Sequence, residues 1–422
     1  MLVSFCKSIK NDVVAMLPRR LGRLTLAQRK ALVVTLISLL GWSLWNGLRT
    51  YPHPWGDLSK GQFTDHFSHM NAARVFPHMG RDIWRVPIDQ KFTALTADEI
   101  QHQPRDIRAG ASGTGGVFHV PGWPAKKPLA ISWSNKTRMY PPGDMILVAP
   151  IALLYHYTSL NLQDACRMLL GWYLVLAHGA LFFFFLTFFE NKGTGIDWMA
   201  CFLTYSQVLY WTLQGFYDPV AMIPLLVCVR YLARGRGLPA AVAYCTATMV
   251  HFRVFFQAPW ALYAGFLMLK NRFWRGLRPR DGIAIVVAVV CAAVSLYVFW
   301  LDWASLGKVY VNNPLHATSG QPNPMMLLSF KVVLGLCLLA FLLSRAWLDL
   351  VTLAWLGLVC FKLRELYFWH FLISMSWFAL PAKHQIDKAV RLAFLMTAMA
   401  IVFNDTFAPT WLQMVYNASS SN

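Results

Sequence analysis

The sequence predicts an all-α, polytopic membrane protein with about 11–13 transmembrane helices and a long extracytoplasmic loop after the first of them. Two features of the composition support this fold class. Hydrophobic residues make up 57% of the chain and charged residues only 14%, whereas soluble domains carry about 25% charged residues. The apolar residues also gather in repeated runs of roughly 16–22, each long enough to cross ~30 Å of hydrocarbon as a helix.

The distribution of basic residues predicts which helix ends face the cytoplasm. The net charge is +19, and its two densest clusters, residues 1–30 and residues 270–281, lie directly beside apolar runs. Basic residues beside membrane spans favour the cytoplasmic side, where they meet anionic lipid headgroups. We therefore predict a cytoplasmic N-terminus, a lipid bilayer as the partner of the basic clusters, and no nucleic acid.

Apolar and polar stretches divide the chain into successive segments. The first apolar run is longer than the core of a signal peptide and follows a basic arm, so we interpret it as a signal anchor. The polar stretch after it is rich in Pro, Gly and His and contains no span-length apolar run. The predicted segments are the basic arm 1–30, the first transmembrane helix 31–48, the extracytoplasmic loop 49–143, the transmembrane core 144–269, the basic cytoplasmic loop 270–281, the C-terminal transmembrane bundle 282–406 and the tail 407–422.

Counting the apolar runs requires one irregular segment. If every run crossed the membrane once, the basic loop 270–281 would fall outside, against the charge rule. We predict that the run 198–213 is re-entrant, because Thr204, Gln207 and Thr212 make it polar enough to fold back inside protein. The other runs after the first helix are 145–157, 168–189, 219–232, 238–255, 258–269, 283–300, 325–343, 351–363, 366–380 and 390–403.

The eight cysteines fall mostly within apolar runs and form no C-x-x-C pair. We interpret them as small core residues. The sequence therefore predicts neither a disulfide framework nor a zinc site.

The polar loop contains the segment 65–84, which reads DHFSHMNAARVFPHMGRDIW. A helix that begins at Asp65 places His69 one turn along on the same face. Asp65 can serve as the N-cap of that helix after Thr64, or as a catalytic carboxylate at the membrane surface, and the two roles are compatible. Asp65, His69 and Asp82 could also bind a divalent metal ion, although their spacing matches no metal-binding motif.

Three further segments carry polar residues next to apolar runs. Residues 138–144 read RMYPPGD, residues 214–219 read QGFYDP, and residues 251–259 read HFRVFFQAP. Each can be a loop-to-helix junction, where proline starts a helix and a basic side chain snorkels to the surface. Each can instead supply groups that bind a phosphate, because charges in a membrane bundle are commonly functional. The candidate substrate-binding residues are His69, Arg138, Tyr140, Tyr217, Asp218, His251, Arg253 and, in a later run, Lys331.

Taken in order, these segments form a longer pattern. It runs D-x-x-x-H-x-x-A-A-R…G-x-D-I-W, then Y-P-P-G, G-x-Y-D, R-x-x-x-R-G-R and F-R-x-x-x-x-x-P. This pattern resembles the GT-C superfamily of membrane glycosyltransferases, and it is most similar to the bacterial type that uses polyprenol-phosphate-linked mannose. The resemblance covers residues 65–259, and the second half of the chain is matched only by its hydropathy.

The resemblance implies a GT-C-like fold and an enzyme of the bacterial inner membrane whose active site faces the periplasm. Such an enzyme transfers a hexosyl or pentosyl group from a polyprenyl-phosphate donor to a lipid, glycan or protein acceptor. The family's acidic residue in the first outer loop corresponds to Asp65, with Asp57 as the competitor. Asp65 would act as general base in a displacement with inversion, and no cofactor is implied beyond an optional divalent metal.

Cationic residues near the outer surface would stabilise the leaving phosphate, and Arg138, His251, Arg253 and Lys331 are the candidates. Aromatic residues such as Trp84 could stack on the sugar. The chain departs from the family in having His69 where Tyr is common, and in the length of its first outer loop.

Two other membrane functions fit part of the pattern. A polysaccharide polymerase or ligase also uses lipid-linked sugars, but it usually carries its large outer loop late in the chain. A transporter or flippase would have inverted repeats and helices broken at mid-membrane, and the sequence has no clear repeat. We therefore prefer the glycosyltransferase interpretation.

Overall fold

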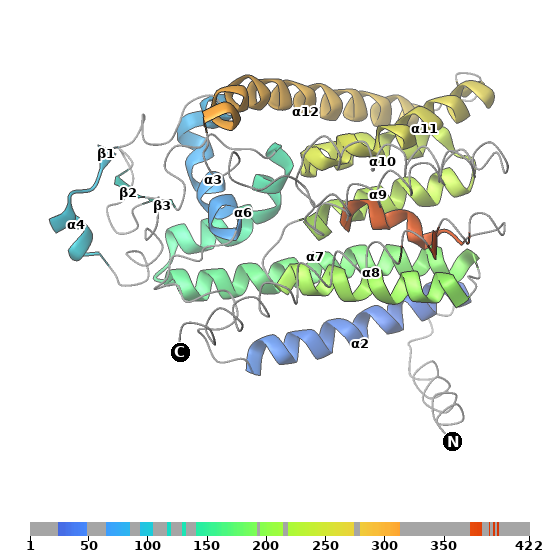
Figure 1. Cartoon of the computed structure of the whole chain (residues 1–422), viewed down its shortest axis with the longest axis horizontal. Helices are drawn as coiled ribbons and strands as arrows, with labels where there is room; N and C mark the ends of the chain where they lie inside the picture. Colours follow the sequence, from blue (N-terminus) through green and yellow to red (C-terminus); the bar gives the residue numbers. More distant parts are fainter. Residues whose placement is uncertain are drawn as a thin grey trace, which may run out of the picture.

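The computed structural model is mostly helical, as predicted, with a small sheet at one end (Figure 1). It describes residues 24–48, 65–84, 93–103, 116–119, 129–131, 141–191, 195–213, 218–273, 279–312, 372–381, 388, 391–392 and 395. The first part contains α2 (Leu26–Leu48), α3 (Asp65–Met79), η3 (Gly80–Trp84), β1 (Thr93–Ala94), α4 (Ala97–Gln101), β2 (Gly116–His119), β3 (Leu129–Ile131) and α6 (Pro142–Tyr157). The bundle continues with α7 (Leu162–Asn191), α8 (Gly195–Leu213), α9 (Asp218–Ala233), α10 (Gly237–Val250), η5 (Phe252–Gln257), α11 (Ala258–Lys270), α12 (Pro279–Asn312) and η7 (Ile373–Ala379).

The long helices lie side by side, and α3 crosses one end of them (Figure 1). α2 packs on α7, α7 packs on α9, and α10 packs between α9 and α12. α3 packs on α6, and η3 reaches α12. The sheet and α4 lie beyond α3, away from the bundle. The segment 49–143 thus places its described elements at a single end of the bundle, which we call the loop end.

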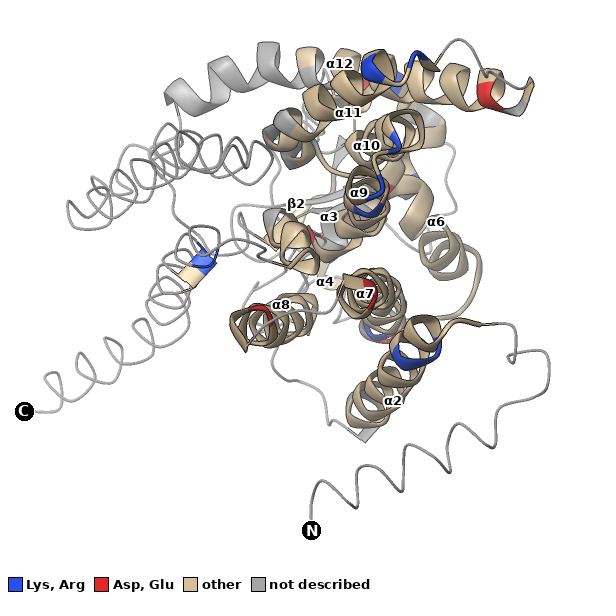
Figure 2. Cartoon of the chain, turned by 90° about the vertical axis from the view of Figure 1, so that its right-hand side faces the viewer, with Lys and Arg blue, Asp and Glu red and all other residues tan. Residues whose placement is uncertain are grey.

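The opposite end carries many of the basic residues, and we call it the basic end. Glu190, in the last turn of α7, bonds Arg230 at 2.7 Å and Arg234 at 3.0 Å near the end of α9. Lys30, early in α2, lies 5.9 Å from the ring centre of Phe189. The start of α2 and the ends of α7 and α9 therefore lie together, and Figure 2 looks onto this end and its Lys and Arg residues.

The loop between α9 and α10 at the basic end is short and closely bonded. α9 ends in a Schellman turn, in which Gly235 has a φ of 67° and Arg236 donates its N–H to the carbonyl of Tyr231. Glycine adopts this left-handed backbone without steric cost, so it is the favoured residue there. The side chain of Asn271 donates to the carbonyl of Gly235 at 2.9 Å, which places the end of α11 at the same end.

The apolar run that does not cross the bundle is α6, so the prediction of a re-entrant α8 was wrong. α8 starts at the basic end, where Trp198 packs edge-on against Phe188 of α7 with ring centres 4.8 Å apart. It leads directly to Asp218, at the loop end. α6 instead begins at the loop end, where Gly143 packs against Met249 in the last turn of α10. It then leads into the start of α7 at that same end. Because α6 stays at the loop end, the other long helices that the structure describes alternate in direction. The described parts of the two predicted basic clusters therefore share one end.

The predicted apolar runs from 31–48 to 283–300 each correspond to a helix with similar bounds. The clearest differences are α12, which continues to Asn312 where the prediction ended the run at residue 300, and α10, which ends at Val250 where the prediction extended the run to residue 255. The runs 325–343 and 351–363, and most of 390–403, lie outside the described residues. Among the described cysteines, Cys201, Cys228, Cys245 and Cys291 are free thiols, as expected for core residues.

The long loop contains an antiparallel sheet that we did not predict. Its strand order is β1-β2-β3, with Phe118 of β2 opposite Ala94 on one side and Leu129 on the other. The strands are 2, 4 and 3 residues long, too short for an alternating pattern to be visible in the sequence. α4 follows β1 and begins with a capping box between Thr96 and Glu99.

A buried polar cluster attaches α2 to the bundle. The hydroxyl of Ser38 lies 2.8 Å from Nε2 of His178 on α7 and 2.8 Å from the hydroxyl of Tyr205 on α8. Nδ1 of His178 lies 2.7 Å from the carbonyl of Leu174, so Nδ1 carries the hydrogen and Nε2 accepts from Ser38. Such bonds between helices contribute about 0.6–2 kcal/mol in an apolar environment, and they fix the rotation of α2.

Two helices are long and apolar enough to cross a membrane, among the residues that the structure describes. They cover Arg167–Asn191, with mean hydropathy 2.0, and Asp281–Val298, with mean hydropathy 2.3. Gly237–Val250 and Trp260–Lys270 are apolar but shorter. Only 17% of the apolar window of α12 is buried, so most of its apolar side chains face outward. These features indicate membrane association.

Candidate functional site

Buried polar side chains gather at the loop end of the bundle. In an apolar interior a polar or charged group is costly unless it is paired, so such a group commonly has a functional role in a membrane bundle. The buried polar side chains of the loop end come from α3, the start of α6, the start of α9 and the segment between α10 and α11. They are Asn71, Arg74, Asp144, Asp218, His251 and Gln257, each at most 3% exposed.

The centre of this group is a pair between neighbouring antiparallel helices. Asp218 begins α9 and His251 follows the last residue of α10, and their Oδ1 and Nε2 atoms are 3.5 Å apart. Both side chains are buried, at 2% and 0% exposure. A carboxylate at a helix start and an imidazole at a helix end each complement the partial charge of that end. The predicted substrate-binding residues Asp218 and His251 are therefore neighbours.

The start of α6 packs against the same end of α10. Pro141 and Pro142 lead into the helix with backbone angles that suit its first turn. A Cβ atom on Gly143 would lie 2.3 Å from the carbonyl oxygen of Met249, so only glycine allows this approach. Asp144 follows and is fully buried, at the helix end where a negative charge is favoured.

We expect Gly143→Ala to destabilise the protein by about 1–3 kcal/mol, the usual cost of overpacking. The added methyl group would meet backbone atoms of Met249, which cannot rotate away as a side chain does. Thermal unfolding in detergent measures the effect. Gly171→Ala is the matched control, because a Cβ at Gly171 has nothing within 4 Å and alanine favours the helix. Equal midpoints for the two variants would contradict the close contact.

α6 is also fixed to α7. Pro150 lies inside α6, where it removes a helical hydrogen bond and bends the helix. The indole N–H of Trp172 donates to the carbonyl of Leu147 at 2.7 Å, beside that interruption. Trp172 of α7 thus supports α6 at the place where the hydrogen bonding within α6 is weakest.

α3 begins at Asp65, as predicted, and its buried face lies on α6. The guanidinium of Arg74 lies 4.9 Å from the ring centre of Tyr155, and its Nη1 donates to Oδ1 of Asn71 at 3.1 Å. Burial lowers the pKa of Arg74 to about 10, and the charge interaction with Tyr155 opposes this shift. Arg74 therefore stays positively charged at neutral pH.

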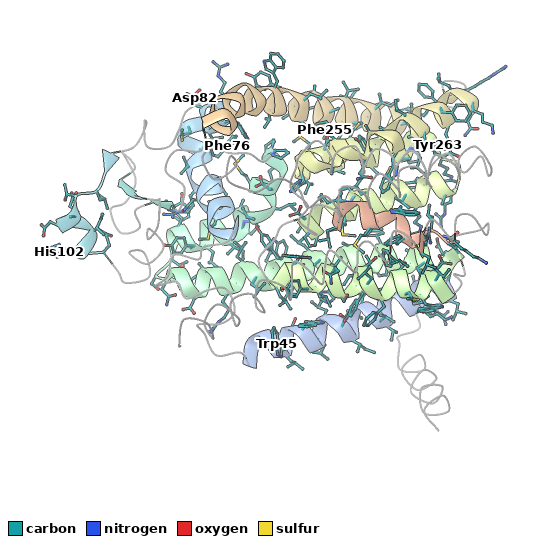
Figure 3. All side chains as sticks on the ribbon, in the orientation of Figure 1. Trp45, Phe76, Asp82, His102, Phe255 and Tyr263 are labelled. Carbon is teal, nitrogen blue, oxygen red and sulfur yellow. The ribbon has the colours of Figure 1, made fainter. Side chains whose placement is uncertain are left out.

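Trp84 packs inside the junction between α3 and α12, and its predicted stacking on a sugar stays a prediction. It is 4% exposed, and its ring packs edge-on against Phe76 with centres 5.9 Å apart. Together with Ile83 it contacts Val298 of α12 in one apolar cluster. Figure 3 shows Phe76 and Asp82 at this junction between α3 and α12.

The other predicted site residues are described only in part. The backbones of Asp65 and His69 lie in α3, and that of Arg253 lies in η5 next to His251. Their side chains are outside the described part of the chain. Asp57, Arg138, Tyr140, Tyr217 and Lys331 lie wholly outside it.

No group of three His, Cys, Asp or Glu side chains that could hold a metal ion is present among the described residues. Asp82 is partly exposed in η3. The predicted divalent metal therefore stays a prediction.

Four buried polar residues of the loop end, Asn71 among them, were not chosen as site residues from the sequence, although each lies inside a segment that was. Arg74 closes the A-A-R pattern after Asp65, Asp144 follows Y-P-P-G, and Gln257 lies before Ala258-Pro259. The signal that could have selected them is a polar residue at the boundary of an apolar helix. Each was interpreted as part of a junction, while other polar residues of the same segments were preferred.

A second buried ion pair lies near the start of α8, at the basic end. Nη1 of Arg391 is 2.5 Å from Oδ1 of Asp197, and the guanidinium lies 4.7 Å from the ring centre of Trp377. This pair joins α8 to the described residues near the C-terminus. It is remote from Asp218 and His251, so it does not belong to the loop-end site.

The loop end therefore combines buried carboxylates, a buried imidazole and a buried guanidinium beneath a crossing helix. Carboxylates can accept a proton, and cationic groups can bind an anion such as a phosphate. Comparison with protein-family models, with curated proteins and with solved structures gives no match for this chain.

Proposed function

We propose that this chain is a polytopic membrane protein with its basic end in the cytoplasm and its loop end outside. The support is the outward-facing apolar surface. On α12, Ile283 is 68% exposed, Val286 is 62% exposed and Trp300 is 69% exposed, and α2, α8 and α11 carry similar residues. A soluble monomer rarely exposes a continuous apolar surface of this extent, whereas a bilayer covers it. The basic end then follows the positive-inside rule.

We further propose that it is a glycosyltransferase that uses a polyprenyl-phosphate-linked sugar at the outer surface of a bacterial inner membrane. One observation carries this proposal. The buried charged residues outside the basic end gather at the loop end, beneath the helix that Asp65 begins. The phosphate of a polyprenyl-phosphate donor lies at the level of the lipid headgroups. The loop end would lie at that level, so we propose that sugar transfer takes place there.

In the proposed reaction, Asp65 accepts the proton of an acceptor hydroxyl as its oxygen attacks the anomeric carbon. The bond between that carbon and the phosphate oxygen breaks, and the configuration inverts. The leaving polyprenyl phosphate gains negative charge, which a nearby cation stabilises. His251 and Arg253 are the candidates of which the structure describes at least the backbone.

A transfer assay tests the proposal. Purified protein in nanodiscs is incubated with radiolabelled polyprenyl-phosphate sugars and a lipid or glycan extract as acceptor. Label that moves from one donor to an acceptor supports the proposal. Transfer of whole oligosaccharides from a diphosphate carrier would support a polymerase or ligase. Movement of the intact donor across the membrane without transfer would support a flippase, and either outcome would overturn the proposal.

A further inference from the structure

We propose that Arg74 is a positioning residue, which fixes α3 on α6 and thereby sets where Asp65 lies over the loop end. The predicted effect of Arg74 on turnover rests on the proposed function, whereas its predicted effect on the packing of α3 does not. Arg74 lies more than two helical turns after Asp65 on the same helix, so it acts through the helix that both residues share.

The first observation is the face that α3 turns inward. Met70, Asn71, Arg74 and Val75 are all buried, at 0–3% exposure. Residues spaced by three and four positions form one helix face, so Arg74 lies within the contact surface with α6. An arginine at such a position contributes to packing as well as charge.

The second observation is how its charge is accommodated. A buried guanidinium is costly without compensating interactions. The ring of Tyr155, with its centre 4.9 Å away, provides one such interaction, because a cation–π contact is stronger when it is shielded from water. The bond to Asn71 provides another. Because a cation–π contact requires the guanidinium to lie over the ring, it restricts how α3 can slide or rotate on α6.

α3 needs an external restraint because it is a weak helix by itself. It has 15 residues and contains Pro77, which removes one backbone hydrogen bond. Isolated helices of this length are marginal in water. Gly80 then ends it with a φ of 52°. Its orientation must therefore come from tertiary contacts.

α6 offers a fixed surface for that contact. Its start is held by Gly143 against Met249, and its middle is held by the bond from Trp172 to Leu147. Tyr155, near its end, is 1% exposed. The bundle thus fixes α6, α6 fixes the ring of Tyr155, and that ring fixes Arg74 and α3.

The test uses Arg74→Lys, Tyr155→Leu, their double variant and Tyr155→Phe in the full-length protein in nanodiscs. Hydrogen exchange of the backbone amides in α3 reports its packing, and initial rates with the polyprenyl-phosphate sugar report kcat and KM. Lysine keeps the charge but loses the planar stack, whereas phenylalanine keeps the ring. Arg81→Lys is the matched control, because Arg81 lies close by in η3 and is exposed.

We expect Arg74→Lys and Tyr155→Leu each to speed exchange in α3 and to lower kcat by about tenfold or more, as misplaced catalytic groups do. KM for the donor should change by less than about twofold, because the base does not act in donor binding. The double variant should resemble either single variant, since both remove one contact. Tyr155→Phe and Arg81→Lys should behave as wild type.

Unchanged exchange in α3 for Arg74→Lys would overturn the inference, and so would an effect confined to KM. If the wild-type protein transfers no sugar from any donor, the proposed function fails. The exchange measurements with the double variant then still decide whether Arg74 and Tyr155 hold α3.

Discussion

Replacing Asp65 by asparagine is expected to lower kcat for sugar transfer by about 10²–10⁴-fold, the contribution typical of a general base. The amide has nearly the same size as the carboxylate but cannot accept the proton of the acceptor hydroxyl. Asp65 is the first residue of α3, so it lies in the first turn, where losing the negative charge costs only about 0.3–1 kcal/mol of helix stability. The substitution therefore removes the base at a small cost to the helix.

Initial rates with the labelled donor measure this effect, and thermal unfolding verifies that the fold is kept. Asp57→Asn is the decisive control, because Asp57 is the rival candidate in the same loop. A loss of turnover confined to Asp57→Asn would transfer the role to that residue. Full activity in Asp65→Asn would rule out Asp65 as the base, and a large fall in the unfolding midpoint would indicate that its role is structural.

The helices of the bundle could be predicted because each apolar run carries its own signal. α7 and α12 have mean hydropathies of 2.0 and 2.3 over their apolar windows, and α9 starts at Asp218, within one residue of the predicted start at 219. Crossing direction has no such local signal. α6 is as apolar as its neighbours, and tertiary contacts, such as those of Gly143 with Met249 and of Trp172 with Leu147, hold it at the loop end. α8 contains polar residues, yet it runs along the bundle beside α7, and those side chains bond within the helix.

Thr204 and Thr212 illustrate this point, since their hydroxyls donate to the carbonyls of Ala200 and Val208 one turn earlier. Trp211 similarly bonds the side chain of Gln207. Polar groups satisfied inside one helix do not require a re-entrant fold. The error in the sequence prediction was therefore to treat polarity as evidence for irregular backbone, when its cost depends on hydrogen bonding.

The site was predicted less completely than the fold, for a related reason. Asp218 and His251 were selected separately, from one motif at the start of α9 and another after the end of α10. Only the packing of α9 on α10 brings Oδ1 of Asp218 within 3.5 Å of Nε2 of His251. Arg74 and Asp144 were passed over because burial cannot be read from their local sequence. A buried charge at a helix boundary has the same local pattern as an exposed cap.

Removing the charge of Asp218 is expected to be among the most destabilising changes in the bundle. Asp218→Asn leaves His251 buried beside an amide, and breaking a buried pair commonly costs about 3–5 kcal/mol. The length of the contact, 3.5 Å between Oδ1 and Nε2, exceeds that of a strong hydrogen bond, so we expect the lower end of that range. Transfer should fall as well, because His251 is a candidate for the phosphate.

The matched control lies at the other end of the bundle. Glu190 also pairs with basic residues, but its side chain is 23% exposed and that of Arg234 is 45% exposed. Water and salt screen such pairs, whose contribution is about 0–1 kcal/mol. Glu190→Gln should therefore lower the unfolding midpoint far less than Asp218→Asn, measured side by side in one detergent.

The double variant Asp218→Asn, His251→Gln distinguishes stability from function. It replaces both members of the pair, so its unfolding midpoint should recover part of the loss seen in Asp218→Asn, since neutral partners of similar shape tolerate burial. Its transfer activity should not recover, because the imidazole is gone. If both midpoint and activity return to wild-type values, the pair neither stabilises the bundle nor contacts the donor. The site would then have to be sought around Arg74 and Asp144.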